Sequence, residues 1–184
     1  MIIVATPSRR SLSFASLLAA FVVACTPPPY DDQTDKAIST LQSDVDTEIV
    51  SLLSFAHTAS AGGSGASDAK TKGGYQANKT FYQKVDVELM SIKLRVDAAP
   101  SVSTSQMDKA LEALRQNILS GPGSLQSVHQ QEDLPGEAYF TTERTILAQQ
   151  FQALLTYELL LKNGSASTNN TTTGTTPTPA SAKK

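Results

Sequence analysis

Apolar residues recur every three or four positions along most of the chain after residue 33, which is the spacing of one face of an α-helix. Four stretches are long enough to be the main helices of a domain, and they cover residues 34–57, 75–99, 103–120 and 137–162. No stretch alternates convincingly with the two-residue period of a β-strand. The pattern therefore predicts an all-α fold, an up-and-down four-helix bundle with disordered termini, whose body spans residues 34–162.

Each stretch has a set of apolar positions that would face the core. In the first stretch these are Ile38, Leu41, Val45, Ile49, Leu52, Leu53 and Ala56, and in the second they are Phe81, Val85, Leu89, Ile92, Val96 and Ala99. In the third they are Met107, Leu111, Leu114 and Ile118. The last stretch is apolar over most of its circumference, through Phe140, Ile146, Leu147, Phe151, Leu154, Leu155, Tyr157, Leu160 and Leu161. It is therefore expected to be the central helix.

Local signals indicate where the helices begin and end. Pro100 would stop the second helix, since proline cannot continue the backbone hydrogen bonding. Ser103 with Gln106 forms a capping-box pattern for the start of the third helix. Asn163 followed by Gly164 would end the last helix.

Two segments between the long helices are expected to be shorter elements. Residues 58–74 are rich in glycine and form a loop longer than the two to eight residues usual between bundled helices, so they are either a mobile functional loop or a tolerated insertion. Residues 125–131 fit a short helical piece before the turn at Leu134, Pro135 and Gly136.

The two ends of the chain differ from the body in composition. Residues 25–33 include three consecutive prolines, which favour a stiff extended spacer. Residues 163–184 are mostly threonine, serine, asparagine and proline, and they contain no large apolar side chain. Such a segment cannot bury enough surface to offset the entropy of ordering, so a disordered tail is expected.

Residues 1–24 have the organisation of an export signal. Arg9 and Arg10 form a basic start, and the apolar run from Leu12 to Ala24 is too short to span a bilayer. The order Val22-Val23-Ala24-Cys25 resembles the lipobox of bacterial lipoprotein precursors, although that family more often has leucine at the position of Val22. The resemblance covers only these first 25 residues.

The resemblance implies a specific chemistry at Cys25. Its sulfur would take a diacylglyceryl group as a thioether, cleavage between Ala24 and Cys25 would free an amine, and that amine would take a third acyl chain. Two or three chains anchor a protein durably, whereas one binds only marginally. Thr26, rather than aspartate, follows the cysteine, and by the same resemblance this favours the bacterial outer membrane, with the body facing the periplasm. The alternative is a secreted protein in which Cys25 is an idle thiol.

The route of export is left open by the sequence. The run from Ser8 to Leu12 is similar to the twin-arginine signal, although Ser13 and Phe14 depart from it, and export of the unfolded chain is the other route. Removal of residues 1–24 takes away two arginines and no acidic residue, so 13 basic and 17 acidic residues remain, a net charge of −4. An acidic body is not attracted to anionic lipid, so membrane attachment is expected to depend on the acyl chains.

Composition excludes several classes of protein. One cysteine cannot form a disulfide within the chain, and one cysteine with two histidines does not supply the usual four ligands of zinc. The net charge of −2 excludes a strongly basic nucleic-acid binder. His57 and His129 lie near predicted helix ends, where a histidine stabilises the last turn, so a shared metal is the weaker interpretation. No nucleophile, base and orienting group occur at sensible spacing, so no catalytic residue, metal or cofactor is predicted.

The second helix has a second apolar stripe. Val87, Met90 and Leu94 lie opposite its core face, spaced by three and four positions, with charged residues alongside. Either the glycine-rich loop or the piece at 125–131 covers this stripe, or it docks a partner or a second copy. Arg144 and Glu158 fall on the apolar side of the last helix, where each needs a partner from another helix or else lines a polar groove.

Three function classes follow from these observations. The first is a membrane-anchored envelope lipoprotein whose helical module binds a protein partner or itself, as a scaffold or assembly subunit. The second is a helical lipoprotein that binds a small ligand in the bundle interior or near the glycine-rich loop. The third, an enzyme, is disfavoured because no catalytic constellation is present.

Overall fold

The structure of the chain, a computed structural model, describes residues 31–98 and 102–169. Within these ranges all regular secondary structure is helical, and no strand is present. The four long elements are α1 (Asp32–Ala61), α3 (Tyr75–Ala98), α4 (Val102–Arg115) and α6 (Glu137–Asn169). Two short helices, α2 (Ala66–Gly73) and α5 (Leu125–Glu132), lie between them, and α4 continues into a π-helical turn, Gln116–Ser120. The predicted all-α fold is confirmed.

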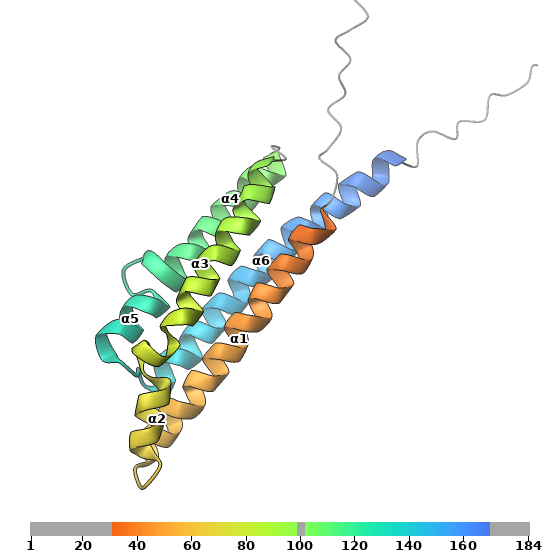
Figure 1. Ribbon diagram of the computed structural model, residues 1–184. Coiled ribbons are helices and arrows are strands. Elements are labelled where there is room, and N and C mark those ends of the chain that lie inside the picture. Colours follow the sequence, from red (N-terminus) through yellow and green to blue (C-terminus); the bar gives the residue numbers. More distant parts are fainter. Residues whose placement is uncertain (1–30, 99–101, 170–184) are drawn as a thin grey trace, which may run out of the picture.

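The four long helices pack in chain order around one core. Helix α1 packs against α3 and α6, and α4 packs against the same two helices from the other side. Successive long helices run in opposite directions, as an up-and-down bundle requires (Figure 1). Helix α1 begins and α6 ends at the same end of the bundle, which we call the terminal end; α2 and the turn between α5 and α6 lie at the opposite end, which we call the loop end (Figure 1).

The helical periodicity identifies most of the core. The fully buried side chains include Ile38, Leu41, Ile49, Leu52, Val85, Leu114, Ile118 and Leu154, which come from all four long helices and the π-helical turn. The second helix was predicted one position out of register at its start, because Phe81 is only half-buried while Tyr82 is buried. The predicted core position Ala99 lies outside the described residues.

The expectation that the last helix is central is wrong. Helix α6 packs against α1 and α4 and therefore occupies one corner of the bundle. Ile146, Leu159 and Leu160 are exposed on its outer side. The apolar residues of α6 are thus more numerous than its two neighbours can cover, and a nearly continuous apolar circumference does not by itself place a helix at the centre.

The expected loop at residues 58–74 is also largely wrong. Helix α1 continues to Ala61, and α2 forms within the glycine-rich stretch. Gly62 and Gly63 have positive φ values, 72° and 86°, so these residues make the turn that separates the two helices. In α2, Asp68 and Lys72 form an ion pair one turn apart, at 2.9 Å. The non-helical part shrinks to Gly62–Gly65 and Gly74, a length usual between packed helices.

The other boundaries agree to within one or two residues, with one exception. Helix α4 begins at Val102, one residue before the predicted cap, and α5 ends one residue later than predicted. The predicted end of the last helix at Asn163 and Gly164 is wrong, because α6 continues to Asn169. A glycine inside a helix costs only about 1 kcal/mol relative to alanine, which does not force a helix to end. The tail predicted to be disordered is therefore helical over residues 163–169, and residues 170–184 lie outside the described ranges.

The π-helical turn has a local cause. The Gly121 amide donates a 2.7 Å hydrogen bond to the Gln116 carbonyl oxygen five residues earlier, which is the π-helical pattern. A Cβ atom at Gly121 would lie 2.7 Å from that oxygen, closer than a real Cβ contact. Glycine is therefore required at this position by the close approach of the backbone.

Within residues 31–98 and 102–169, none of the helices is both long enough and apolar enough to cross a bilayer.

Candidate functional site

The outer side of α3 carries an exposed apolar row formed by Val87, Met90 and Leu94. Their exposed fractions are 67%, 56% and 69%, whereas Val85, Leu89, Ile92 and Val96 on the other side of the same helix are buried. Neither α2 nor α5, nor any other described residue, covers the row. We call these three residues the α3 row. Of the two interpretations of this stripe, cover by the chain's own described loops is therefore excluded.

A groove between α3 and α4 runs beside the α3 row. Its volume is about 280 Å³, and Met90 forms one of its walls. It is lined by Leu89, Met90, Lys93, Leu111, Glu112 and Arg115. The apolar members supply a floor and the charged ones a rim, which is the organisation of many protein-binding surfaces.

The charged rim of the groove is held by ion pairs between the two helices. Lys93 bonds to Asp108 of α4 and to Asp97 one turn further along α3, and these bonds raise the pKa of its ammonium group. Arg115 donates from Nε to Asp86 Oδ1 at 3.1 Å. All of these side chains are about half exposed, so they fix the rim without being desolvated.

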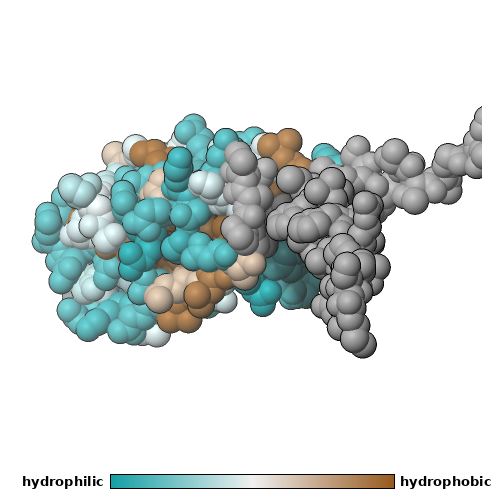
Figure 2. All heavy atoms as spheres, turned by 90° about the horizontal axis from the view of Figure 1, so that it is seen from above, coloured by the Kyte–Doolittle hydropathy of each residue, from teal (hydrophilic) through white to brown (hydrophobic). Residues whose placement is uncertain are grey.

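The space-filling view toward the terminal end shows how the apolar surface is distributed. Brown hydrophobic surface appears there in small patches separated by teal hydrophilic residues (Figure 2). In the part of the chain that the structure describes, the exposed large apolar side chains outside α3 are those of Val50, Ile146, Leu159 and Leu160. Among the described residues only α3 has three of them in helical register, more than half exposed and next to a groove.

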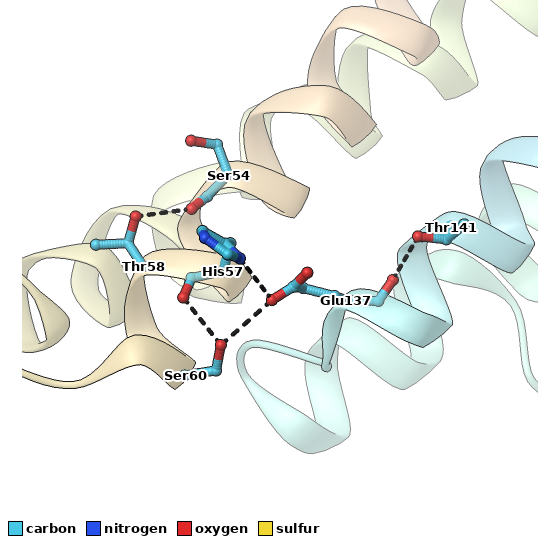
Figure 3. Close-up of polar contacts among 6 residues, drawn as sticks. All are labelled: Ser54, His57, Thr58, Ser60, Glu137 and Thr141. Atoms are coloured by element: carbon cyan, nitrogen blue, oxygen red, sulfur yellow. Dashed lines mark hydrogen bonds and ion pairs between the residues drawn. The ribbon is translucent and has the colours of Figure 1, made fainter.

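A second candidate lies at the loop end, where α1 meets the start of α6. His57 Nδ1 lies 3.0 Å from Glu137 Oε1, and the Ser60 hydroxyl lies 3.3 Å from the same carboxylate oxygen and 2.9 Å from the His57 carbonyl oxygen (Figure 3). His57 was predicted to stabilise the end of its own helix. That prediction is wrong, because α1 continues for one more turn and His57 pairs across the α1 and α6 interface instead.

These three residue types are those of a hydrolase triad, but the connections differ. In a triad the serine hydroxyl bonds to the imidazole, which removes its proton, and the carboxylate holds the other ring nitrogen. Here Ser60 bonds to the carboxylate and to a backbone carbonyl, and none of its bonds reaches the imidazole (Figure 3). The imidazole cannot act as its base in this arrangement, so the cluster fastens α1 to α6 rather than activating a nucleophile.

A hollow of about 410 Å³ lies close to this cluster. It is lined by Ala56, Ala59, Ser60, Lys70, Glu132, Asp133, Leu134, Pro135 and Gly136. Asp133 has a positive φ of 61°, an uncommon conformation for a residue other than glycine, and the Leu134 amide bonds to the Glu132 carbonyl at 2.8 Å across it. The Asp133 carboxylate accepts the Tyr75 amide at 3.0 Å and so caps the start of α3. The unusual turn is therefore explained by packing.

His129 is fully buried and belongs to a network that the sequence did not predict. Its Nε2 lies 2.8 Å from the Gly73 carbonyl oxygen, and its Nδ1 lies 2.7 Å from the Tyr82 hydroxyl. Since a carbonyl can only accept, Nε2 carries the proton, and Tyr82 donates to Nδ1. Burial lowers the pKa of His129, so the ring is neutral. His129 follows Leu125 by four positions on one face of α5, and this spacing was the available signal of its burial.

Neither histidine joins a metal site in the described structure. Within residues 31–98 and 102–169 no three histidine, cysteine, aspartate or glutamate side chains are grouped so that they could hold a metal ion. His129 uses both ring nitrogens within the fold, and His57 uses one on Glu137.

Arg144 and Glu158 have different surroundings. Arg144 is half-exposed and bonds to both carboxylate oxygens of Asp46 on α1, at 2.7 and 3.1 Å, beside a groove of about 210 Å³ between α1 and α6. Glu158 is buried, and its Oε2 has no hydrogen-bond partner. Burial, together with the nearby carboxylates of Asp35 and Asp31, raises the pKa of Glu158 to about 7. The prediction of an interhelical partner is thus met by Arg144.

The predicted lipidation and cleavage residues, Cys25 and Ala24, lie outside the described residues. The first described helix begins seven positions after Cys25, at Asp32. An extended chain spans at most about 3.3–3.6 Å per residue, so the start of α1 lies within about 25 Å of Cys25.

Comparisons with protein families, with curated proteins and with solved structures give no match to this chain.

Proposed function

We propose that this protein is a lipid-anchored bacterial envelope protein whose helical bundle holds a protein-interaction surface on α3. The observation that carries the proposal is the α3 row, because it exposes three large apolar side chains in helical register beside a groove with a charged rim. Exposed apolar patches with a polar rim are typical of interaction sites, and the α3 row beside its charged groove has this organisation. The lipobox resemblance of residues 22–25 supports the anchor.

The geometry of the bundle agrees with such an anchor. The start of α1 is tied by its short connection to within about 25 Å of Cys25, so the terminal end would lie near the membrane surface. The α3 row lies along the side of the bundle, where a partner in the periplasm would have access to it. We propose the outer membrane as the location, because Thr26 rather than aspartate follows Cys25.

The anchor is tested by the variant Cys25→Ser. In cells supplied with a clickable palmitate analogue, the unchanged chain should take up the label and sediment with membranes, whereas Cys25→Ser should do neither. Uptake of label by the serine variant, or no uptake by the unchanged chain, would contradict the proposed lipidation.

The interaction surface is tested by the double variant Met90→Ser/Leu94→Ser. Both side chains are exposed, so their loss should leave the thermal midpoint nearly unchanged while abolishing crosslinked association in envelopes. The matched control is Leu159→Ser/Leu160→Ser, which removes two similarly exposed leucines from α6 and should retain association. A large loss of stability in the α3 variant would show instead that the row is part of the core.

A second candidate function, the binding of a small ligand, is favoured by the hollow at the loop end. Its volume of about 410 Å³ lies within the range of small-molecule pockets, and Lys70, Glu132 and Asp133 line it, so the ligand would be polar. Native mass spectrometry of the purified chain, compared with Lys70→Ala, tests this function. A co-purifying ligand that the variant loses would support it.

A further inference from the structure

The charges along α3 have an order that bears on what covers the α3 row. The sequence from Lys84 to Asp97 can be compared with the same sequence in reverse order. Each charged residue then stands opposite a residue of the other charge, and most apolar residues stand opposite apolar ones. The matched pairs are Lys84 with Asp97, Val85 with Val96, Asp86 with Arg95, Val87 with Leu94, Glu88 with Lys93 and Leu89 with Ile92. Such a sequence is complementary to a second copy of itself running in the opposite direction.

We propose that the α3 row docks against the α3 row of a second copy of this chain, with the two helices antiparallel about a two-fold axis near Met90. This inference rests on the proposed interaction surface and names its occupant. Val87 of one copy then lies level with Leu94 of the other, and the two Met90 side chains lie beside the axis. The members of each matched charged pair then lie at the same height and have opposite charges.

Helix geometry also brings Asp86 of one copy close to Lys93 of the other at the edge of the contact. At 100° per residue, Asp86 and Lys93 lie on the same flank of the α3 row. In a two-fold antiparallel pair the same flank of each helix faces the other, and a rise of 1.5 Å per residue leaves Asp86 about 3 Å in height from Lys93 of the second copy. The axis generates this contact twice.

The groups involved have capacity for these additional bonds. Lys93 and Asp86 are each about half exposed while bonded to Asp108 and to Arg115 of their own chain. An ammonium group has three donors, and a carboxylate accepts through two oxygens, so each can bond across the axis without losing its internal partner. The groove of about 280 Å³ beside Met90 provides a hollow for a side chain of the facing helix.

A parallel pair is disfavoured by the same charges. In a parallel two-fold pair the same flank of each helix lies on opposite sides of the contact, so Asp86 of one copy does not meet Lys93 of the other and these attractions are absent. A partner without this pattern would offer no opposite charges to Asp86 and Lys93 along the edge of the row.

The antiparallel pair also permits both copies to be anchored in one membrane. Arg95 of α3 pairs with Asp31 at the start of α1, at 3.4 Å, so α1 begins nearly level with Arg95. That level is about 7 Å from the axis, so the two α1 helices start about 14 Å apart along the bundle. Each start lies within about 25 Å of its Cys25, and two bundles lying along the surface can therefore share it. One helix pair makes a small interface, so confinement to the membrane would strengthen a weak dimer.

The orientation is tested with single cysteines in the full chain carrying Cys25→Ser. Val87→Cys and Leu94→Cys chains, distinguished by a tag, are oxidised mildly alone and as a mixture. The antiparallel pair predicts a mixed disulfide at least about tenfold above either self-linked product, because matching cysteines lie about 10 Å apart along the helix while Val87 and Leu94 are level. Self-linked products from each variant alone would indicate a parallel pair and overturn the proposal.

The charge pattern is tested by complementation. Asp86→Lys and Lys93→Glu should each weaken self-association about tenfold, whereas an equimolar mixture should restore it, because the mixed pair regains both attractions. Exposed ion pairs contribute little to stability, so both variants should fold, and circular dichroism checks this. Association of each variant alone at the level of the unchanged chain would overturn the proposal.

The same cysteines separate failure of this inference from failure of the proposed function. In envelopes of cells making the Val87→Cys chain with Cys25 intact, a crosslink to a different protein and none to the Leu94→Cys chain would overturn self-docking and leave the interaction surface standing. Absence of any crosslink to the α3 row would count against both.

Discussion

Tyr82 of α3 donates a 2.7 Å hydrogen bond to Nδ1 of His129 in α5, and the opposite nitrogen of the ring donates to the Gly73 carbonyl oxygen at the end of α2. One neutral imidazole thereby joins α5 to α2 and α3, which lie about 50 residues earlier in the chain. The rings also pack, with Tyr82 and Phe140 each edge-on to His129, at centroid distances of 5.8 and 6.1 Å. This network fastens the short helices to the bundle, and its protonation state has consequences for stability.

The network predicts a loss of stability in acid. Burial lowers the pKa of His129 in the folded chain below its value of about 6.5 in the unfolded chain. As pH falls below about 6.5, the unfolded chain binds a proton that the folded chain excludes, so the free energy of unfolding decreases until the pH reaches the folded pKa. Urea unfolding between pH 8 and pH 5 should show this decrease.

The variant His129→Gln is the control for that titration. Glutamine disrupts the buried network, so the variant should be less stable than the unchanged chain at pH 8. Glutamine cannot be protonated, so the decrease in stability below pH 6.5 that is due to His129 should be absent. If the unchanged chain and the glutamine variant have the same slope below pH 6.5, the assignment to His129 is wrong. The comparison is made in a Glu158→Gln background, since Glu158 titrates in an overlapping range.

Removal of the Tyr82 hydroxyl should leave a buried acceptor without a donor. Tyr82→Phe keeps the ring and its packing but deprives His129 Nδ1 of its bond, which should lower the free energy of unfolding by about 1–3 kcal/mol. The matched control is Tyr75→Phe, whose hydroxyl bonds at 3.1 Å to Gln126 in a partly buried setting. Tyr75→Phe should lower the free energy of unfolding by less than Tyr82→Phe does. Equal decreases for the two variants would contradict the proposed tautomer, in which Tyr82 donates to His129 Nδ1.

Glu158 should destabilise the bundle as pH rises. The pKa of Glu158 is raised to about 7 in the folded chain, from about 4.5, because its carboxyl group is buried. The folded chain holds this proton more tightly than the unfolded chain does. The resulting contribution to the free energy of unfolding, about 3 kcal/mol, is fully present below pH 4.5 and is lost as the pH rises through 7. Glu158→Gln should therefore unfold at a higher temperature than the unchanged chain at pH 8. The two proteins should be nearly equal at pH 4, and equality at both pH values would show that the carboxylate finds a partner.

Gly121→Ala should disrupt the π-helical turn. Its Cβ would meet the Gln116 carbonyl oxygen at 2.7 Å, which forces the backbone to shift, at a cost of about 1–3 kcal/mol. Gly136→Ala is the control, because nothing lies within 4 Å of its added Cβ, and its thermal midpoint should be unchanged or slightly raised. A tolerated Gly121→Ala would mean that α4 can end without the π-helical bond.

The fold was largely predictable because helical periodicity is a local property of the sequence. Ile38, Leu41 and Val45 on α1, like Met107 and Leu111 on α4, could be assigned to the core from their spacing alone. The position of α6 at a corner could not, since exposure of Ile146 depends on which helices are its neighbours. Helix α2 was missed because the glycines around it are strong turn signals, while its own stability comes from packing on α1 and α3.

The candidate sites also divide into those that a local sequence pattern predicts and those that depend on contacts between distant residues. The α3 row was predictable, since Val87, Met90 and Leu94 are spaced as one face of a helix. The bonds of His129 and the pairing of His57 with Glu137 join residues distant in the sequence, and no local pattern reports them. The order of charges along α3 can be seen in the sequence. It indicates self-association only because Val87 and Leu94 are exposed, and that exposure is known from the structure.

The start of α1 and the end of α6 lie at the same end of the bundle, and this arrangement has a mechanical consequence. Helices α1 and α6 are antiparallel neighbours, and the first begins where the second ends. Tension applied between the two termini would therefore peel α1 from α6 turn by turn, instead of loading their whole contact at once in shear. Unfolding under force is governed by the barrier along the pulling direction, and peeling meets a sequence of small barriers. The bundle should thus yield at low force when pulled through its ends, while resisting forces applied across its sides.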